Sequence, residues 1–323
     1  MTRSTRQLSG PARIAVDLLG GDHAPAVVVD GALLACSADP DLRLVLVGPT
    51  SVADEVLAAL PAADRSRVSV ATATRPDDGP LRAVETADGP LSAARPGTTV
   101  GAAVDAVVHG YADAVVSAGN SGATVTAAVI GLGRVVRRPP LACTLPGLDG
   151  PVVLLDVGAS VDPSPPVLVQ HAVLGAAYAA ALLGLDHPRV GLLSIGTEAD
   201  KGDRWRRSAY GRLAGTALPN GAEFVGNVEG YDVSRGARAD VVVTDGFTGN
   251  VLLKGVEAAY VLAGGEMSAD TAPRAAALLG IGGTVVVCHG EANGPDFASG
   301  IELAAQLHRL GTTARLWRSE VIT

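Results

Sequence analysis

Short runs of Val, Ile and Leu, each ending in glycine or a small polar residue, recur along the whole sequence. Apolar runs of this length are typical of strands covered on both faces, as in a mostly parallel sheet. Ala-rich segments with helical spacing separate them. This alternation implies right-handed crossovers and predicts an α/β fold, a three-layer α/β/α sandwich around a doubly wound sheet. The predicted strands with their polar turns are residues 13–22, 42–48, 68–72, 112–120, 151–159, 189–198, 239–250 and 284–290, and the predicted helices are residues 24–38, 100–110, 123–136, 167–184 and 301–311.

The length of 323 residues suits one large α/β unit. We predict a single catalytic domain over residues 11–323, with a division into two lobes left open, and a disordered tail over residues 1–10. Residues 72–99, rich in Pro and Gly, predict an irregular surface segment, and residues 264–274 predict a second break. The apolar stretches are short and interrupted, so we expect no membrane span, no secretory signal and a cytoplasmic location.

Composition and missing motifs argue against several classes of protein. The net charge of −8 argues against a nucleic-acid partner. Cys36, Cys143 and Cys288 lie far apart beside apolar residues, which predicts buried, reduced thiols. The sequence contains no dinucleotide fingerprint, P-loop, serine nucleophile elbow or paired metal-ligand spacing. We therefore predict no cofactor and no metal.

The turns at the strand ends carry the candidate site, because ligands of open α/β sheets bind at the carboxyl ends of the strands. Glycine lets the backbone approach a ligand, Ser, Thr and Asn add donors, and the following helix points free N–H groups at the same place. This chemistry suits an oxyanion such as phosphate. The candidate binding residues are Asp17, Gly20, Gly21, Asp22, Ser117, Gly119, Asn120, Ser121, Gly122, Asp156, Gly158, Thr197, Glu198, Glu229, Asp245, Gly246, Thr248 and Gly249.

The acidic residues of these turns allow two interpretations. They can bind a metal, or they can cap helices and orient neighbouring donors, and we favour the second. His23 and His289 lie in strand-end turns, where a general acid or base is expected. The four remaining histidines lie in or beside helical segments and are predicted to be surface or packing residues: His109, His171, His187 and His308.

Several ordered segments carry a resemblance that covers residues 14–307: IAVDLLGGDHAP, DAVVSAGNSGA, CTLP, LLDVGASVD, RVGLLSIGTEADKG, EFVGNVEG, ADVVVTDGFTGNVLLK and LLGIGGTVVVCHG. Together they resemble the phosphate acyltransferase family of bacterial phospholipid synthesis, the PlsX proteins. The resemblance implies a fold like that of the phosphotransacetylases and the isocitrate dehydrogenase superfamily, and a homodimer. It also implies transfer of a fatty acyl group from acyl carrier protein to inorganic phosphate, which gives an acyl phosphate.

This chemistry suggests roles for individual residues. We place phosphate near residues 117–122 and 245–250, with Lys201 or an arginine balancing its charge. Asn227 or Asn250 would face the tetrahedral oxyanion, and His289 would protonate the leaving sulfur. Acyl carrier protein is acidic, so an acidic chain needs a local basic dock. The candidates for this dock are Arg134, Arg137, Arg138, Arg204, Arg206 and Arg207.

The sequence departs from the family pattern at several places. A basic run that the family carries after Arg95 is missing, and Ser160 stands where the family has asparagine. Glu291 places a negative charge where a neutral donor is expected. The long Lys-rich helices expected after Lys254, the family's membrane-touching and acyl-binding element, are shortened to about twenty residues between Ala263 and Leu279. This shortening puts membrane association and a long acyl chain in question.

Three functions therefore remain open from the sequence. The leading one is an acyltransferase from acyl carrier protein to phosphate, in phospholipid synthesis or in a specialised pathway. The second is acyl transfer to another acceptor. The third is a paralogue without catalysis that binds a carrier protein.

Overall fold

The computed structural model describes residues 10–62, 64–73, 98–262 and 275–318. The predicted tail apart from its last residue, most of the irregular segment at 72–99 and the break at 264–274 lie outside these residues. The chain divides into two compact units, Met1–Ala127 with Gly283–Thr312 (unit 1) and Ala128–Gly282 with Thr313–Thr323 (unit 2). In both units helices pack against a sheet, so the predicted α/β class is confirmed.

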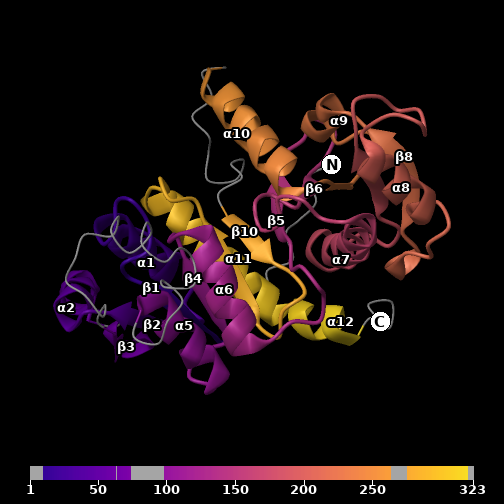
Figure 1. Ribbon diagram of the computed structural model, residues 1–323. Coiled ribbons are helices and arrows are strands. Elements are labelled where there is room, and N and C mark those ends of the chain that lie inside the picture. The colour runs from indigo at the N-terminus through magenta and orange to yellow at the C-terminus, as the bar shows by residue number, and fades with distance from the viewer. Residues whose placement is uncertain (1–9, 63, 74–97, 263–274, 319–323) are drawn as a thin grey trace, which may run out of the picture. The chain divides into compact units, whose positions relative to one another are not determined.

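Unit 1 contains a parallel sheet in the strand order β3-β2-β1-β4-β11 (Figure 1). Because all its strands run the same way, their carboxyl ends lie along one edge. The strands are β1 (Ala12–Asp17), β2 (Leu42–Gly48), β3 (Val68–Thr72), β4 (Ala114–Ser117) and β11 (Thr284–Cys288). The helices are α1 (Ala26–Ala38), α2 (Thr50–Ala59), α5 (Thr99–Val108) and α11 (Gly294–Arg309), and α6 (Ser121–Leu132) begins in this unit.

Unit 2 contains strands in the order β10-β5-β6-β9-β7-β8. Strand β5 runs antiparallel to both of its neighbours, while β6, β9, β7 and β8 are parallel. The strands are β5 (Leu141–Leu145), β6 (Val152–Leu155), β7 (Arg189–Leu193), β8 (Glu223–Val228), β9 (Val241–Val243) and β10 (Ala275–Leu278). The helices are α7 (Pro165–Leu183), α8 (Arg204–Leu213), α9 (Gly230–Arg235) and α10 (Gly246–Leu262), and the short α12 (Thr312–Arg318) begins at the end of unit 1.

Helix α7 is the central helix of unit 2. It packs on β6, β7 and β9 and buries His171 and Tyr178 completely. By length and composition alone it could cross a membrane, with 19 residues and a mean hydropathy of 1.6, so the expectation of short, interrupted apolar stretches was wrong here. More than half of that window is buried inside the protein, as in the core helix of a soluble domain.

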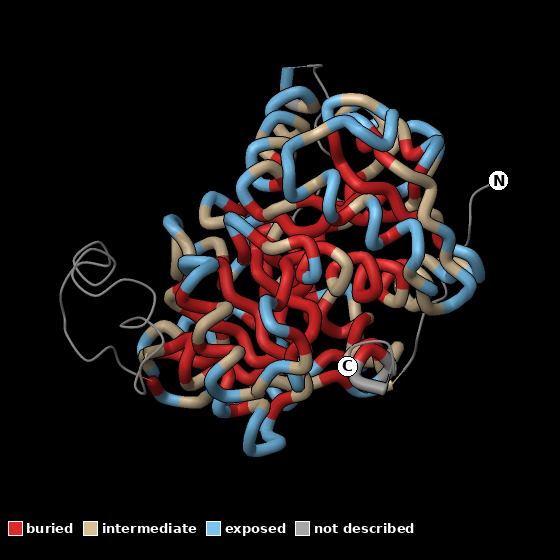
Figure 2. Tube along the Cα trace, turned by 45° about the vertical axis from the view of Figure 1, so that its right-hand side comes forward, coloured by how far each residue is buried: buried red, intermediate tan, exposed pale blue. Residues whose placement is uncertain are grey.

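The strands that the sequence predicts best are the buried ones. Every residue of β4, β6 and β9 is buried. Figure 2 shows that buried residues form continuous stretches of the trace. Such strands are covered on both faces and therefore consist of unbroken apolar runs. The prediction of buried thiols is also confirmed, and burial raises the pKa of Cys143 and that of Cys288 to about 12.

Three strands and several helices were not predicted. Strand β8 contains glutamate, glycine and asparagine, and β10 is mostly alanine, which favours helices. Strand β5 is a short apolar run that we had noted only as part of the resemblance. The unpredicted helices include α2, the arginine-rich α8 and the short α9 and α12.

Candidate functional site

In unit 1 the last residues of two neighbouring strands are joined by a buried hydrogen bond. Ser117 Oγ, after β4, donates to Asp17 Oδ2, at the end of β1, over 2.7 Å. The same hydroxyl accepts from Gly119 N–H at 3.0 Å, and Asp17 Oδ1 accepts from Leu19 N–H at 3.2 Å. Asp17 thus orients backbone and hydroxyl donors, as the favoured interpretation of the acidic residues predicts.

Two glycines allow the backbone to pack against this pair. A Cβ on Gly20 would lie 2.7 Å from Asp17 Oδ2, from Ser117 Oγ and from Gly119 N, so no side chain fits there. Gly21 has a φ of +109°, which favours glycine, and Asp22 N–H donates to Gly290 O at 2.9 Å. The turns after β1, β4 and β11 therefore lie together, as predicted.

The same group of turns contains a helix start and a histidine. Asn120 Oδ1 accepts from Ala123 N–H at 3.0 Å, so it caps α6, and Ser121 and Gly122 occupy the exposed first turn. Glu291 N–H donates to His289 Nδ1 at 3.1 Å, which places the proton of the neutral imidazole on Nε2. His289 is thus set up as a donor through Nε2.

In unit 2 the buried carboxylate of Asp156 organises the turn after β6. Its Oδ1 accepts from the N–H groups of Leu141, Gly158 and Ala159 at 3.0, 3.1 and 2.9 Å, and its Oδ2 from that of Ser160 at 2.6 Å. Burial raises the pKa of Asp156, and nearby His171 and these N–H donors oppose the rise. Burial likewise lowers the pKa of His171, whose Nε2 donates to Arg138 O at 3.0 Å.

The turn organised by Asp156 contacts the start of α10. Gly246 N–H donates to Ser160 O at 2.7 Å, and Asn250 Nδ2 donates to Val157 O at 3.1 Å. Gly249 lies so close to Asp156 O that a Cβ there would overlap it. The predicted residues of the turns after β6 and β9 are therefore in direct contact.

Asp245, before α10, is compensated by neighbours. It accepts from Thr248 N–H and Oγ1, both at 2.8 Å, and forms an ion pair with Arg206. Burial alone would raise the pKa of Asp245, but the hydrogen bonds from Thr248 and Arg206 lower it below its usual value.

Arg206 itself differs from the prediction that it helps to dock a carrier protein. Its side chain is only 17% exposed, and it donates to Leu193 O and to Thr248 Oγ1 as well as to Asp203 and Asp245. It is therefore an internal link, whereas Arg204 and Arg207 beside it, like Arg134, Arg137 and Arg138, remain exposed.

The loop after β7 combines exposed charge with buried polar atoms. Asn227 Nδ2 donates to Glu198 O at 2.7 Å, which fixes the loop that carries Thr197 and Lys201 on its surface. Ser194 Oγ and Asn227 Oδ1 are buried and have no hydrogen-bond partner within the described residues. Sequence reasoning missed Ser194, although its place directly after an apolar run marks it as a strand-end residue.

Asn227 and Glu229 both have local structural roles. Asn227 lies inside β8 directly after Gly226, which has a φ of +89° beside a register shift. Glu229 is the exposed N-cap of α9, where its carboxylate accepts from the N–H of Asp232 in a capping box. These local roles account for both residues.

The predicted site residues thus form two groups, one in each unit. Unit 1 holds the group around Asp17, Ser117 and His289, and unit 2 the group around Asp156, Asn227 and Asp245. Among the described residues no three His, Cys, Asp or Glu side chains are arranged to hold a metal ion.

Comparison with known proteins shows the family to which this sequence is similar. The sequence profile of a family described as "Fatty acid synthesis protein" matches residues 12–275. The chain is 42% identical over 248 residues to the phosphate acyltransferase of Desulfitobacterium hafniense (strain Y51), covering 76% of this chain and 70% of that protein. It is 39% identical over 334 residues to that of Thermobifida fusca (strain YX), covering 94% and 89%.

Solved structures share the fold at lower identity. The EutD phosphotransacetylase from Staphylococcus aureus matches with a TM-score of 0.59 and 18% identity, over 95% of this chain and 96% of that one. A phosphotransacetylase from Streptococcus pyogenes matches with a TM-score of 0.65 and 16% identity, over 93% and 94%. These likenesses confirm the predicted fold class.

Proposed function

Because this chain belongs to the family of fatty acid synthesis proteins that includes the phosphate acyltransferases, we propose that it transfers an acyl group from an acyl carrier protein thioester to inorganic phosphate. A phosphate oxygen attacks the thioester carbonyl, the new C–O bond forms, and the C–S bond breaks. The products are an acyl phosphate and the free thiol of the carrier. The site must bind a dianion, stabilise an oxyanion and supply a proton to sulfur.

One observation carries this proposal: the two inward-facing carboxylates of the unit 2 group, Asp156 and Asp245, are compensated by neighbouring donors, whereas Lys201 is exposed. Asp156 accepts four backbone N–H groups and Asp245 pairs with Arg206. Lys201 is exposed and forms no ion pair with any described residue. The carboxylates of Asp156 and Asp245 therefore do not oppose an anion here, Lys201 offers it a positive charge, and water and salt screen the exposed Glu198.

The amide side chains support the oxyanion role. Asn227 Nδ2 and Asn250 Nδ2 each use one N–H on a backbone carbonyl, and a primary amide has a second N–H to donate. In unit 1 the neutral His289 carries its proton on Nε2, from which it can donate a hydrogen bond to the leaving sulfur. Within each unit, therefore, the described residues offer hydrogen-bond donors of the kind that this chemistry needs.

The proposal is tested with purified protein, an acyl carrier protein thioester and phosphate, trapping acyl phosphate as its hydroxamate with hydroxylamine. We expect thioester loss that depends on phosphate. Thioester loss without phosphate would indicate another acceptor, and carrier binding without turnover would indicate a non-catalytic paralogue.

A matched pair of variants tests the role of Lys201. Lys201→Ala should raise the KM for phosphate by about tenfold or more, the order expected for one charge-assisted contact. Lys254→Ala serves as the control, because Lys254 Nζ pairs with Glu257 at 2.7 Å within α10. An equal phosphate KM in both variants would remove Lys201 from the phosphate site.

A further inference from the structure

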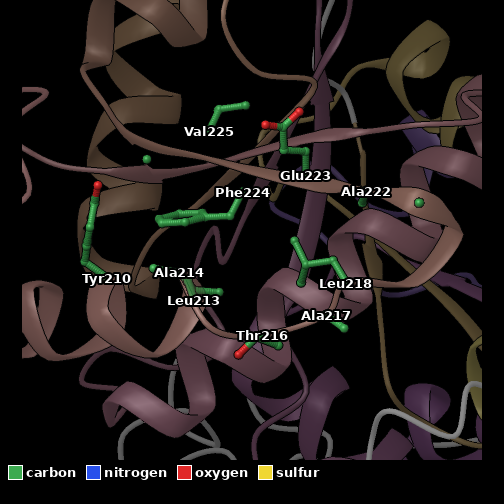
Figure 3. A pocket seen from close by; sticks show the side chains of 12 residues that line it. Tyr210, Leu213, Ala214, Thr216, Ala217, Leu218, Ala222, Glu223, Phe224 and Val225 are labelled. Carbon is green, nitrogen blue, oxygen red and sulfur yellow. The ribbon is translucent and has the colours of Figure 1, made fainter.

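A groove of about 810 Å³ in unit 2 lies between the end of α8, residues 214–222 and strand β8 (Figure 3). Its volume lies within the range of about 300–1,000 Å³ that is usual for small-molecule sites. Leu213, Leu218 and Phe224 line it with apolar side chains, and Tyr210 meets Phe224 edge to face with ring centroids 5.3 Å apart. Figure 3 shows Glu223 and Val225 on the opposite side of β8 from Phe224.

The strand that borders this groove is an edge strand. Among the described strands β8 pairs only with β7 and stands last in the strand order. An edge strand turns the N–H and C=O of every second residue away from its partner, ready to pair with another extended chain. The groove therefore has apolar side chains on one side and unpaired backbone amides on another.

This combination discriminates between possible ligands. A plain alkyl chain would cover the unpaired amides of β8 without bonding them, which is unfavourable. An extended chain that alternates amides with short aliphatic links satisfies both surfaces, in the manner of strand addition to a sheet edge. The pantetheine arm of a thioester donor has this chemistry and carries the thioester at one end.

The groove is also adjacent in sequence to the candidate site. Gly226 is one of its lining residues, and the next residue is Asn227, whose amide is a candidate oxyanion donor. We propose that this groove binds the pantetheine arm of the acyl donor, with the amides of the arm paired to β8 and the thioester end at Gly226. The inference rests on the proposed function in that it takes the donor to be a pantetheine thioester, a chemistry shared by acyl carrier protein and coenzyme A.

A binding experiment tests the groove independently of catalysis. Free pantetheine is titrated into the full-length protein by calorimetry or NMR, using the wild type, Ala217→Trp, Ala214→Trp and the control Ala59→Trp. All three alanines are exposed, so the tryptophans should not disturb the fold. We expect Ala217→Trp and Ala214→Trp to weaken binding by about tenfold or more, the order of one lost hydrogen bond with its packing, and Ala59→Trp to match the wild type. Equal pantetheine affinity in all four proteins overturns the inference.

Kinetic measurements then distinguish recognition of the pantetheine arm from recognition of the acyl chain. In Ala217→Trp the ratio of kcat/KM for a pantetheine donor to that for an acyl thioester of methyl thioglycolate, which lacks the arm, should fall. The acyl carrier protein and coenzyme A thioesters are compared as separate donors, and a fall for either supports the inference. A loss that depends on acyl length and not on the arm overturns it. So does a dimer that dissociates on the same substitution, because a second copy then covers β8. If no donor turns over but pantetheine binding is lost in the variants, the proposed function fails and the groove assignment stands.

Discussion

Replacing Asp156 by asparagine tests whether one buried carboxylate holds together the turn after β6. The carboxylate is fully buried and accepts four backbone N–H groups, three on Oδ1 and one on Oδ2. Asparagine can keep the three bonds to its carbonyl oxygen. Its NH2 group would then face the N–H of Ser160, which Oδ2 accepts at 2.6 Å in the wild type.

The expected loss of stability follows from this geometry. A hydrogen bond to a charged group contributes about 1.5–3 kcal/mol, and a buried donor left unpaired costs about 1–3 kcal/mol. These two terms overlap, and removing a charge whose ionisation burial already disfavours offsets part of them. We therefore expect Asp156→Asn to lower the free energy of unfolding by about 2–4 kcal/mol. Asp156→Ala removes the partner of all four N–H donors, of which those of Leu141 and Ser160 are buried, so it should cost about 2–6 kcal/mol, a large part of the about 5–15 kcal/mol by which a typical domain is stable.

Urea denaturation followed by circular dichroism measures the effect, with Asp54→Asn on the exposed surface of α2 as the control. The control should stay within about 0.5 kcal/mol of the wild type. If Asp156→Asn is equally close to the wild type, the carboxylate does not organise this turn and the reasoning is refuted.

Further predictions follow from single glycines, carboxylates and thiols. Gly249→Ala should fail to fold because its methyl group would overlap a backbone carbonyl, whereas Gly255→Ala, with open space around it, should stabilise α10 by about 0.5–1 kcal/mol in the same denaturation assay. Measuring the free energy of unfolding as the pH is lowered tests Asp245. Burial alone would raise the pKa of Asp245, but its hydrogen bonds hold the folded-state pKa below the unfolded value. The ionised carboxylate therefore stabilises the fold above the unfolded pKa, and this stabilisation is lost as the pH falls through the folded-state pKa. Asp245→Asn should therefore show a shallower loss below about pH 4, and an unchanged acid limb would contradict the shift. Cys143 and Cys288, with thiol pKa values raised to about 12, should not react with a thiol reagent at pH 8 until the protein is denatured; rapid reaction of native protein would show that these thiols are accessible.

The fold was predictable where burial alone decides the residue types. Strands β4, β6 and β9 are covered on both faces, so their sequences are unbroken apolar runs. Strand β8 lies at the edge, where solvent admits Glu223 and Gly226, and its sequence resembles a turn. Helix α8 is arginine-rich, and it begins because Asp203 caps its N–H groups and it buries Ala209 and Leu213. Neither β8 nor α8 can be recognised from its own sequence before the elements packed against it are known.

The candidate site was predictable as a set of turns but not as a set of contacts. Asp17 and Asp156 were expected to orient donors, and both do so. The sequence does not show which arginine side chain is directed into the protein. Arg206 is, because it pairs with Asp245, a residue almost forty positions away in the chain. The buried hydroxyl of Ser194, which has no hydrogen-bond partner among the described residues, was equally hidden, since burial of a residue after an apolar run is decided by the fold.

The acidic composition of the chain therefore says little about the charge at the site. The carboxylates of Asp156, Asp203 and Asp245 are occupied by backbone N–H groups or by Arg206, so they act as internal anchors and not as free negative charge. Glu291, expected from the sequence to weaken an anion site, is exposed, and its backbone N–H holds His289 Nδ1. Because water and salt screen an exposed carboxylate, its backbone contact affects the imidazole more directly than its charge does. A net charge of −8 is thus compatible with a site for a phosphate dianion, provided that the carboxylates nearest to it have already been compensated by the fold.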